Sequence, residues 1–446
     1  MRFARRLRCV STALTAGVLL VGGSPAHAAT YYVRDTVGND ASDGLSPRTA
    51  WKRLSMLRDL KAGDTAYVGP GLYRDGVDLR NSGTADARIT FVADNAGKYT
   101  GDPPGRVVVT GADPVDETLF APTSRPGVYS LRAPGLRVLE VVEMDSPQYR
   151  YKRAFAAKEH LVDKLSELEV VERLPYSFFY DEKARTLYVH TSDGKAPRTH
   201  EIELVHRGNG FYLGQRHFVT VIGFTFRHMG DAGISFFRGA GDGAAFFNVA
   251  YGSRQGVRVF NAPNVMVHGN TLFRNENSGV YFADRSVNGS AVRNVTYENL
   301  KGMRWGSQSG NAVALENVTF DNLEAGIALE DVAPATLWSN RVGNNRATQL
   351  LALNSKYASD GNCFEKRGPD QFLADFFPYP RDQRFKTLGE YQAARRQDLG
   401  SQDEGCGPWP EKVDVRAVHA ESLAYRDLAL KILAGESPPV TPRPKS

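Results

Sequence analysis

Short segments in which hydrophobic and polar residues alternate recur at a regular interval along the middle of the chain. The motif Asn-x-x-aromatic begins at Asn248, Asn270, Asn294 and Asn317, and Asn340 continues the series at spacings of 22, 24, 23 and 23 residues. A Gly lies five or six residues after each aromatic residue. The alternating segments that follow these Gly residues are Val257-Arg258-Val259, Val280-Tyr281-Phe282, Met303-Arg304-Trp305 and Ile327-Ala328-Leu329.

This interval predicts one coil of a parallel β-solenoid. Alternating segments of three to five residues form strands, and 22–24 residues hold about three of them with their turns. Stacked coils place equivalent side chains about 4.8 Å apart, so we expect the Asn side chains to hydrogen-bond along the stack. The aromatic side chains are expected to form an interior column. Asn294 and Asn317 also fit a glycosylation sequon, but the ladder explains them better.

The ends of such a stack must be covered, and its period is interrupted once. The amphipathic stretch Ala50–Leu60 is expected to lie over the N-terminal end, and residues 116–205 break the period with a hairpin at Tyr176–His190. The predicted organisation is a signal peptide (1–28), an N-terminal cap with the first coils (29–115), an inserted β-rich segment (116–205), central coils (206–355), a C-terminal cap loop with a disulfide (356–412), and a C-terminal helix with a disordered tail (413–446).

The first 28 residues have the features of a secretory signal peptide. Four Arg residues precede an apolar run, and Ala26-His27-Ala28 fits a cleavage site, so we expect cleavage after Ala28 and a secreted or periplasmic protein. The apolar run is too short for a permanent anchor, and no membrane span is expected. Cleavage lowers the formal net charge from +5 to +1, with 51 Lys and Arg against 50 Asp and Glu. A nucleic-acid partner is therefore not expected, and we predict a monomer.

The expectation of export determines how the cysteines are interpreted. Cys9 is lost with the signal peptide, which leaves Cys363 and Cys406. Two Cys residues in an exported protein favour one disulfide between them. Two buried thiols, or a metal site that lacks a second pair of ligands, are the alternatives.

Several segments resemble secreted bacterial right-handed parallel β-helix proteins of the pectate lyase-like superfamily. The resemblance is carried by the coils and by four further segments, which are 31–47, 61–74, 177–181 and 186–189. It implies a right-handed parallel β-helix and the binding or processing of a polysaccharide along one sheet face. The superfamily includes pectate and alginate lyases, polygalacturonase-type hydrolases and mannuronan epimerases. The catalytic motifs of these enzymes are absent from the sequence, so the resemblance transfers no catalytic residue.

Candidate functional residues follow from the alternation of each strand after its Gly. Val257, Val280, Met303 and Ile327 should point inward. The outward file is then expected to comprise Ser235, Arg258, Tyr281, Arg304 and Ala328. The resemblance implies that this sheet carries the carbohydrate. The neighbouring turns supply His228, Asp231, Arg254, Arg274, Glu276, Asn277, Asp284, Arg285, Glu330 and Asp331.

The first functional hypothesis is a lyase that acts on an acidic polysaccharide. β-Elimination requires a neutralised uronate carboxylate, a base for the adjacent proton and an acid for the leaving oxygen. Arg258 and Arg304 could hold successive carboxylates, with Tyr281 between them as base or acid. The alternative is an ordinary solvated polar face, because exposed Arg is common.

The second hypothesis is a glycoside hydrolase. Asp284 and Asp331 are two coils apart, roughly 9.6 Å along the stack, near the upper end of the separation that suits inversion. Glu330 or Asp231 could be the alternate partner, and Arg254, Glu276 and His228 could bind substrate. Carboxylates that cap turns are the structural alternative. The third hypothesis is a non-catalytic, envelope-associated solenoid that binds carbohydrate.

Metal binding is a weaker expectation, and no cofactor is predicted. Asp35, Asn39, Asp40 and Asp43 form an oxygen-rich loop that could bind Ca²⁺ but also suits a tight turn. The nine His residues show no pair at zinc-ligand spacing.

Overall fold

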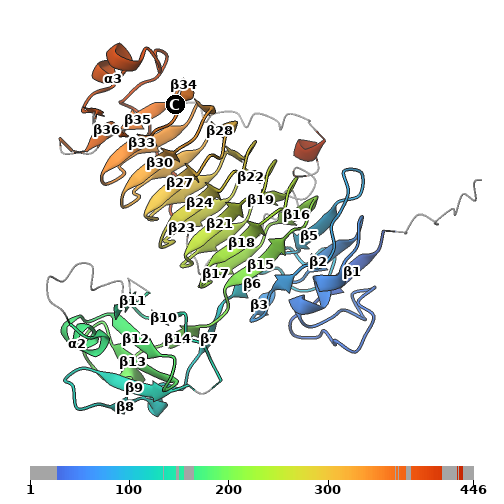
Figure 1. Cartoon of the computed structure of the whole chain (residues 1–446). Helices are drawn as coiled ribbons and strands as arrows, with labels where there is room; N and C mark the ends of the chain where they lie inside the picture. Colours follow the sequence, from blue (N-terminus) through green and yellow to red (C-terminus); the bar gives the residue numbers. More distant parts are fainter. Residues whose placement is uncertain are drawn as a thin grey trace, which may run out of the picture.

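The structure, a computed structural model, describes residues 28–434 except 134, 147–149, 155–164, 367, 370, 378–382, 414–428 and 430. The predicted signal peptide lies outside the described residues apart from Ala28, as do most of the predicted C-terminal helix and its tail. Figure 1 shows a long stack of coils with a smaller body beside it. Within the described residues, no helix is long and apolar enough to cross a membrane.

Three long sheets run the length of the stack, and neighbouring strands within them are parallel apart from β36 and β37 at the C-terminal end. In spatial order, sheet A consists of β1 (Thr30–Val33), β2 (Thr65–Val68), β5 (Ile89–Ala93), β16 (Val219–Ile222), β19 (Ala244–Phe246), β22 (Met266–His268), β25 (Ser290–Val292), β28 (Ala312–Leu315), β31 (Ala335–Trp338) and β34 (Tyr357–Asp360). Sheet B consists of β3 (Gly71–Tyr73), β6 (Val107–Thr110), β17 (Thr225–Arg227), β20 (Val249–Tyr251), β23 (Thr271–Phe273), β26 (Val295–Tyr297), β29 (Val318–Phe320), β32 (Arg341–Gly343) and β35 (Cys363–Glu365). Sheet C consists of β4 (Val77–Asp78), β15 (Asn209–Gly214), β18 (Ala232–Phe237), β21 (Gln255–Phe260), β24 (Ser278–Ala283), β27 (Lys301–Gly306), β30 (Ala325–Glu330), β33 (Thr348–Leu353), β36 (Phe372–Phe377) and β37 (Gln383–Phe385).

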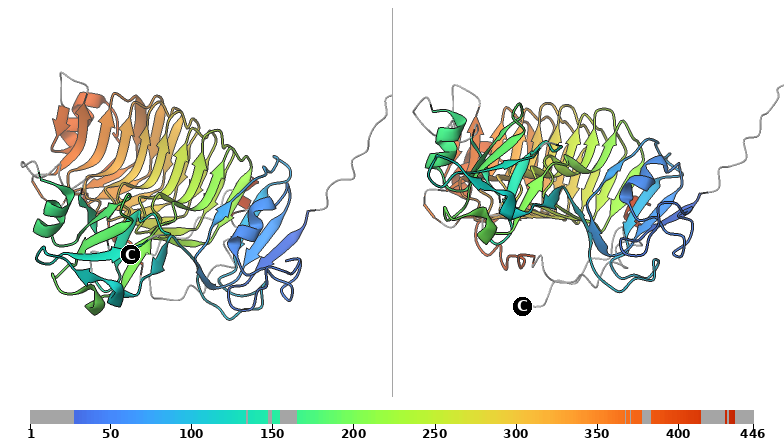
Figure 2. Two further views of the ribbon diagram at one scale, coloured as in Figure 1. Left: turned by 60° about the horizontal axis from the view of Figure 1, so that its bottom comes forward. Right: turned by 90° about the horizontal axis from the view of Figure 1, so that it is seen from below.

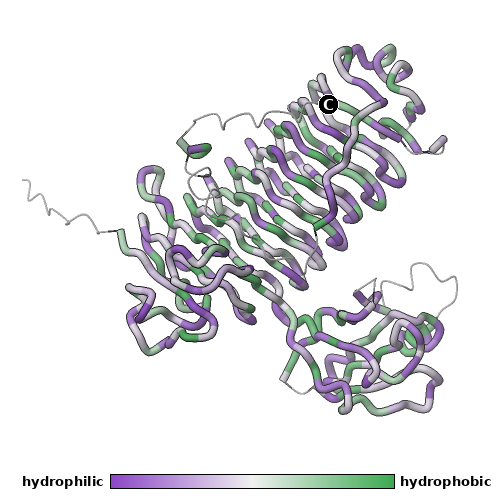
Figure 3. The backbone as a smooth tube through the Cα atoms, turned by 180° about the vertical axis from the view of Figure 1, so that it is seen from behind, coloured by the Kyte–Doolittle hydropathy of each residue, from purple (hydrophilic) through white to green (hydrophobic). Residues whose placement is uncertain are grey.

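Each central coil contributes one strand to sheet C, then one to sheet A and then one to sheet B. The predicted all-β solenoid with coils of about 23 residues is confirmed. The residues predicted to point inward, Val257, Val280, Met303 and Ile327, are at most 1% exposed and belong to the main core. Figure 3 shows hydrophobic and hydrophilic stretches alternating around the coils. Burying the inward side chains supplies the main stabilisation of the stack, because the hydrophobic contribution scales with the apolar area removed from water.

The predicted Asn ladder is present at the turn between sheets A and B. The Asn270 Nδ2 donates to Asn294 Oδ1 at 3.0 Å, Asn294 donates to Asn317 at 3.1 Å, and Asn317 donates to Asn340 at 2.9 Å. The ladder begins at Asn248 and continues to Asn362. Because these amides are buried and paired, they serve the fold as structural groups. A second ladder, between sheets B and C, joins Asn275, Asn299, Asn322 and Asn345.

The predicted aromatic column exists, but its predicted interior position is wrong. Tyr251, Phe273, Tyr297 and Phe320 stack with ring centroids 4.8–5.2 Å apart. Their strand neighbour Ala250 belongs to the main core, whereas the rings form a separate cluster with Trp409. Since successive side chains of a strand point to opposite faces, the rings lie on the outer face of sheet B.

The C-terminal part of the chain covers this outer face. Trp409 continues the aromatic stack beyond Phe320 at 5.6 Å, and the Val413 backbone N–H donates to the Tyr297 hydroxyl at 2.9 Å. The predicted disulfide joins Cys363 to Cys406 and is confirmed. The aromatic side chains are therefore buried although they point away from the solenoid core.

Short helices lie at the two ends of the stack. The 3₁₀ helix η1 (Leu54–Asp59) buries Leu54 and Leu57 in the main core, where the sequence predicts a covering segment. Helix α3 (Leu388–Arg395) begins with a capping box between Thr387 and Glu390. The coils extend further than the sequence predicts, because β34, β35 and β36 fall within the predicted cap loop 356–412.

The smaller body lies between β6 and β15 in the sequence and beside the stack in space, as Figure 2 also shows. We call residues 112–205 the insert. Its first sheet comprises β7 (Ala112–Pro114), β10 (Glu140–Glu143) and β14 (Ile202–Val205). Its second sheet comprises β8 (Ala121–Pro122), β9 (Tyr129–Arg132), β11 (Lys152–Arg153), β12 (Ser177–Asp181) and β13 (Thr186–His190), and its helices are η2 (Glu117–Leu119), α2 (Glu167–Arg173) and η4 (Pro197–Thr199). Strands β12 and β13 form the predicted hairpin.

Candidate functional site

The outer face of sheet C carries the predicted file of side chains in five successive coils. The strand register pairs Ser235 with Arg258, Arg258 with Tyr281, Tyr281 with Arg304, and Arg304 with Ala328. Arg258, Tyr281 and Arg304 are half-buried, whereas Ser235 and Ala328 are fully buried. The file therefore has three large polar side chains at its centre.

At the N-terminal end of the file, Arg258 pairs with Asp231. The Arg258 Nη1 donates to Asp231 Oδ2, and the guanidinium lies 4.3 Å from the ring centroid of Phe237. The ring of Phe260 lies 5.9 Å from the same guanidinium. Stacking on aromatic rings fixes the plane of the guanidinium, so Arg258 is held in one orientation across the sheet.

At the centre of the file, Tyr281 and Arg304 contact each other. The Arg304 guanidinium lies 4.6 Å from the Tyr281 ring centroid, and its Nε donates to Glu330 Oε2 at 2.8 Å. The Lys301 Nζ lies 3.4 Å from Glu330 Oε1 and 3.1 Å from Glu324 Oε1. The structure thus brings Tyr281, Arg304 and Glu330 together, with Lys301 as a fourth member that the sequence analysis did not single out.

Asp284 and Asp331 lie in equivalent turns between sheets C and A, two coils apart. Both adopt positive φ, of 48° and 56°. The Asp284 carboxylate accepts a hydrogen bond from Asn261 of the preceding coil at 3.4 Å, and Asp331 accepts one from Asn354 of the following coil at 2.7 Å. Each carboxylate is therefore bonded on the side away from the other, as expected of residues that stabilise turns.

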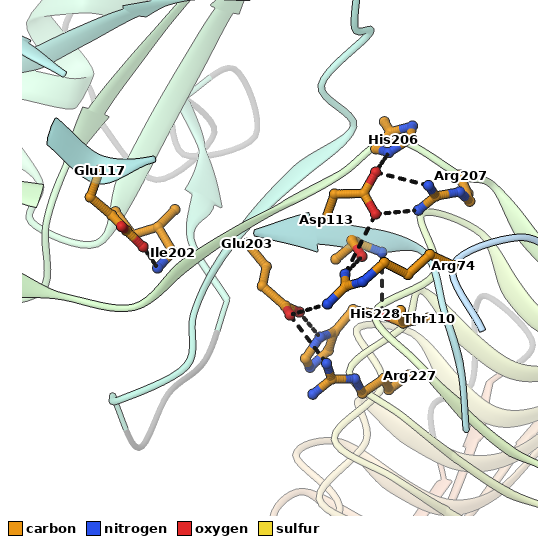
Figure 4. Close-up of polar contacts among 11 residues, drawn as sticks. Arg74, Thr110, Asp113, Glu117, Ile202, Glu203, His206, Arg207, Arg227 and His228 are labelled. Atoms are coloured by element: carbon orange, nitrogen blue, oxygen red, sulfur yellow. Dashed lines mark hydrogen bonds and ion pairs between the residues drawn. The ribbon is translucent and has the colours of Figure 1, made fainter. Parts of the chain in front are cut away.

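His228 lies in a buried charge cluster at the base of the insert (Figure 4). Its side chain is 1% exposed, and its Nδ1 lies 3.3 Å from Glu203 Oε2 on β14. Arg227 and Arg74 lie 3.1 Å and 3.7 Å from Glu203 Oε1. Burial alone would raise the pKa of Glu203, but His228, Arg227 and Arg74 outweigh it and lower that pKa. Burial also lowers the pKa of His228.

A neighbouring carboxylate reinforces this connection. Asp113 on β7 forms a two-pronged ion pair with Arg207 at 3.1 Å and 2.8 Å, and the His206 Nε2 lies 2.6 Å away (Figure 4). Arg74 also reaches Asp113, at 3.5 Å. Both clusters join the insert to the first coils, so they position the insert relative to sheet C. Glu203 and Asp113 could not be identified from the sequence, because no local pattern indicates which turns the insert contacts.

A second connection joins the insert to the turns that border sheet C. Arg150 of the insert donates to the Ser253 carbonyl at 3.1 Å and to Glu276 at 3.1 Å, and it pairs with Glu140 on β10. Burial lowers the pKa of Arg150. The predicted residue Glu276 thus contacts the insert, and Arg254 beside it is exposed.

Among the described residues, Glu143, Asp145 and His200 form the group close enough to share a metal ion. Both His200 nitrogens already face carboxylates, with Nδ1 3.1 Å from Asp145 and Nε2 3.1 Å from Asp193. Burial lowers the pKa of His200, but Glu143, Asp145 and Asp193 outweigh it and raise that pKa. The group is therefore an ion-pair cluster in this structure, and a metal ion would have to displace the carboxylate contacts of His200.

The oxygen-rich N-terminal loop has the contacts of a turn. The Asp40 carboxylate accepts the backbone N–H groups of Lys52 and Arg53. Asp35, Asn39 and Asp43 likewise accept the N–H groups of Leu72, Ala41 and Leu45, respectively. These side chains are engaged with the backbone, as the structural alternative to Ca²⁺ binding predicts.

Comparison with known proteins agrees with this architecture. The model of the family described as "Right handed beta helix region" matches residues 202–364. XylC in complex with xylose is similar, with 14% identity, a TM-score of 0.58 and coverage of 77% of this chain and 66% of that chain. A glycoside hydrolase is also similar, with 10% identity, a TM-score of 0.53 and coverage of 79% and 95%. The match to pectate lyase Pel9A covers 75% of this chain and 69% of that chain, with 14% identity and a TM-score of 0.40.

No curated protein sequence matches the chain. At these identities the similarity to solved structures shows the fold alone. The chain spans 66% of the length of the XylC chain. Residues 202–364 match the model of a right-handed β-helix region, and the whole stack has the architecture of a right-handed parallel β-helix.

Proposed function

We propose that the protein is a polysaccharide-processing enzyme that acts on an acidic glycan at the outer face of sheet C by β-elimination. The observation that carries this proposal is the file of Arg258, Tyr281 and Arg304 in three successive coils. The strands that carry Arg258 and Arg304 are two coils apart, about 9.6 Å along the stack, and the strand that carries Tyr281 lies between them. Such a file suits a chain of sugars that runs along the stack.

The chemistry assigns a role to each member of the file. The Arg304 guanidinium binds a uronate carboxylate and stabilises the negative charge that develops when the adjacent C–H proton is removed, and Arg258 binds a sugar two coils away. The bond from the next carbon to the glycosidic oxygen breaks, a carbon–carbon double bond forms, and the leaving oxygen takes up a proton. Tyr281 exchanges these protons in the proposal, and Glu330 with Lys301 positions Arg304.

Hydrolysis by Asp284 and Asp331 is less well supported. Their two-coil separation fits the upper end of the range for inverting enzymes. Their hydrogen bonds to Asn261 and Asn354, however, hold the carboxylates away from each other. A carbohydrate-binding solenoid without catalysis is the remaining alternative, and product analysis distinguishes it from both enzymes.

A product assay tests the proposed reaction. The mature chain is incubated separately with alginate, pectate and glycosaminoglycans, and unsaturated uronate is followed by ultraviolet absorbance. We expect unsaturated product from at least one of them and a rate lowered roughly 10²–10⁴-fold in Tyr281→Phe, the range for loss of one acid–base group. Tyr188→Phe on the insert, also half-buried, is the matched control and should retain the wild-type rate. No unsaturated product from any substrate contradicts the proposal.

We also propose that the protein is exported. The disulfide between Cys363 and Cys406 supports this assignment, because such bonds persist in oxidising compartments. Intact mass measurement of the protein from the culture fluid or periplasm should give a chain that begins at Ala29. A chain that retains residues 1–28 and accumulates in the cytoplasm contradicts the proposal.

A further inference from the structure

Buried polar atoms that have no hydrogen-bond partner within the described structure gather at the N-terminal end of sheet C, next to the insert. Most buried polar atoms in proteins are paired, as they are in the two Asn ladders of this solenoid. Leaving one unpaired costs about 1–3 kcal/mol. The atoms concerned are Asn209 Oδ1, Asp231 Oδ1, Ser235 Oγ, Gln255 Oε1, Arg258 Nε and Glu140 Oε2.

The strand register brings the solenoid members of this group together. Ala232 of β18 is in register with Asn209 of the preceding strand, β15, and with Gln255 of the following strand, β21. The Gln255 backbone N–H also donates to the Asp231 carbonyl at 2.8 Å. Ser235 pairs with Arg258 in the same two strands. The group therefore spans three neighbouring coils, from the start to the middle of their sheet C strands.

Ser235 shows that the group faces the outside of the solenoid. Its neighbours Ile234 and Phe236 belong to the main core, so the Ser235 side chain points to the outer face. Ser235 is nevertheless 0% exposed, and Gln255 is 4% exposed. These buried polar side chains thus lie on the face proposed to hold the glycan.

The insert brings Glu140 toward this end of sheet C. Gly230, which precedes Asp231, lies so close to the insert that a Cβ there would come within 2.5 Å of Leu139 Cδ1. Glu140 follows Leu139 and is fixed through Arg150, which also binds the Ser253 carbonyl beside Arg254. One Glu140 oxygen pairs with Arg150, and the other is the unpaired atom.

The composition of the group indicates the ligand class. Its two carboxylates, Asp231 and Glu140, are each neutralised by an Arg, so the group offers no net positive charge to an anionic ligand, and their unpaired oxygens accept hydrogen bonds from hydroxyl groups. The aromatic rings of Tyr212, Phe237 and Phe260 lie along the same strands and offer apolar surface. Aromatic surface with a few convergent polar groups is typical of small-molecule sites.

We propose that this end of sheet C is a subsite for an uncharged, hydroxyl-rich sugar residue, formed by Asn209, Asp231, Ser235, Gln255, Arg258 and Glu140. The inference rests on the proposed function in taking sheet C as the glycan-binding face. The substrate class that follows is a mixed glycan, in which an uncharged sugar lies two to three coils along the stack from the uronate held by Arg304. The insert then serves to close one end of the binding face and to supply Glu140.

Calorimetric titration of the mature protein with xylobiose, cellobiose, mannobiose and digalacturonate tests the subsite. We expect at least one neutral disaccharide to bind. Ser235→Leu, which fills the site, should weaken that binding roughly tenfold or more, because the larger side chain takes the space of the sugar and the hydrogen bond of the Ser235 hydroxyl is lost. Gln255→Met, which removes the amide and keeps the side-chain length, should weaken it too. Thr336→Leu, a matched change at an exposed position of β31, should leave it unchanged.

The outcomes separate the subsite from the proposed reaction. Unsaturated product without any binding of a neutral disaccharide overturns the subsite and leaves β-elimination in place. Neutral binding that Ser235→Leu and Gln255→Met abolish, without unsaturated product from any acidic glycan, retains the subsite and overturns the reaction. Neutral binding that neither variant changes also overturns the subsite. If Ser235→Leu fails to fold, Gln255→Met alone decides.

Discussion

The outer faces of sheets B and C are built on the same coils and the same core, but they carry different residues and have different surroundings. Sheet B presents stacked rings, of which Phe273 and Tyr297 are 1% exposed, beneath a segment that includes Trp409 and Val413. Sheet C presents Arg258, Tyr281 and Arg304, all half-buried. On one face the chain covers itself, and on the other large polar side chains stay half-buried at the surface.

This difference shows where the repeat encodes the fold and where it leaves room for function. The inward residues must be apolar in every coil, because they fill a continuous core. The outward residues are free to differ between sheets. An apolar outer face needs a cover, whereas a charged face remains open to a partner. A residue's effect on stability or on activity should therefore depend on the face it occupies.

Replacing one ring on each face gives the largest expected contrast. Phe273→Ala should lower the free energy of unfolding by about 3–5 kcal/mol, as expected for a buried aromatic residue. Tyr281→Ala on sheet C should cost under about 1.5 kcal/mol, because its side chain is half-buried. Denaturant titration with unchanged slope measures both values. Equal losses would mean that the two faces do not differ as described.

Removing the disulfide should weaken the cover of sheet B and leave sheet C unchanged. The bond closes a loop across a sequence separation of 43 residues, and disulfide loss typically costs about 2–4 kcal/mol. The double variant Cys363→Ser with Cys406→Ser should show this loss of unfolding free energy in a denaturant titration. It should also show faster backbone hydrogen exchange at residues 404–413. Faster exchange that appears first in β21 and β24 would refute the assignment of the bond to the cover.

Glu203, on strand β14 of the insert, lies beside the turn that joins sheet B to sheet C. Its contribution to the free energy of unfolding should depend on pH. Its pKa is lowered in the folded protein, so its stabilising effect is complete above the ordinary Glu pKa and is lost as pH falls through the lowered value. Glu203→Gln should cost about 1–3 kcal/mol at neutral pH, because Arg227 and His228 lose their partner.

The pH dependence of unfolding free energy provides the check. The difference in unfolding free energy between the wild type and Glu203→Gln should become progressively smaller as the pH falls. A difference that stays constant from neutral to acidic pH would show that the ionised carboxylate is not the stabilising group. Glu182→Gln, at an exposed position of the insert, is the matched control.

The smallest effect is expected at the edge of the cover. Lys412 pairs with Glu298 and lies 3.1 Å from Asp321, but its side chain is 43% exposed. Exposed ion pairs contribute about 0–1 kcal/mol and are screened by salt. Lys412→Met should therefore lower stability by less than about 1 kcal/mol, with the difference shrinking in high salt. A loss that is larger and independent of salt would indicate packing as its cause.

Sequence periodicity predicted the coils, the first Asn ladder and the register of the sheet C file, because each depends only on residues one coil apart. It placed the aromatic column on the wrong side. Alternation places Tyr251 and Ala250 on opposite faces of the strand but does not show which of them points inward. The sequence also does not show that Trp409 and Val413 return to cover the larger side chains. The second ladder was readable in principle, since Asn275, Asn299, Asn322 and Asn345 are spaced by 24, 23 and 23 residues.

The part of the candidate site that depends on the insert could not be predicted from periodicity. Glu140 and Arg150 meet Ser253 and Glu276 across long sequence separations, and nothing in the repeat indicates which coils the insert contacts. The ion pair of Arg304 with Glu330 could not be predicted from the repeat either, because it joins the middle of one strand to the end of the next strand. Long-range charge pairing is decided by three-dimensional placement.

The central claim, that sheet C is the glycan-acting face, is tested most directly by a crystal structure of Tyr281→Phe with an oligosaccharide of a glycan that the wild-type protein cleaves. The account predicts density for the sugar chain along the file, with a uronate carboxylate at Arg304 and an uncharged sugar beside Ser235. An oligosaccharide bound along sheet A or sheet B, with the sheet C file empty, would contradict it.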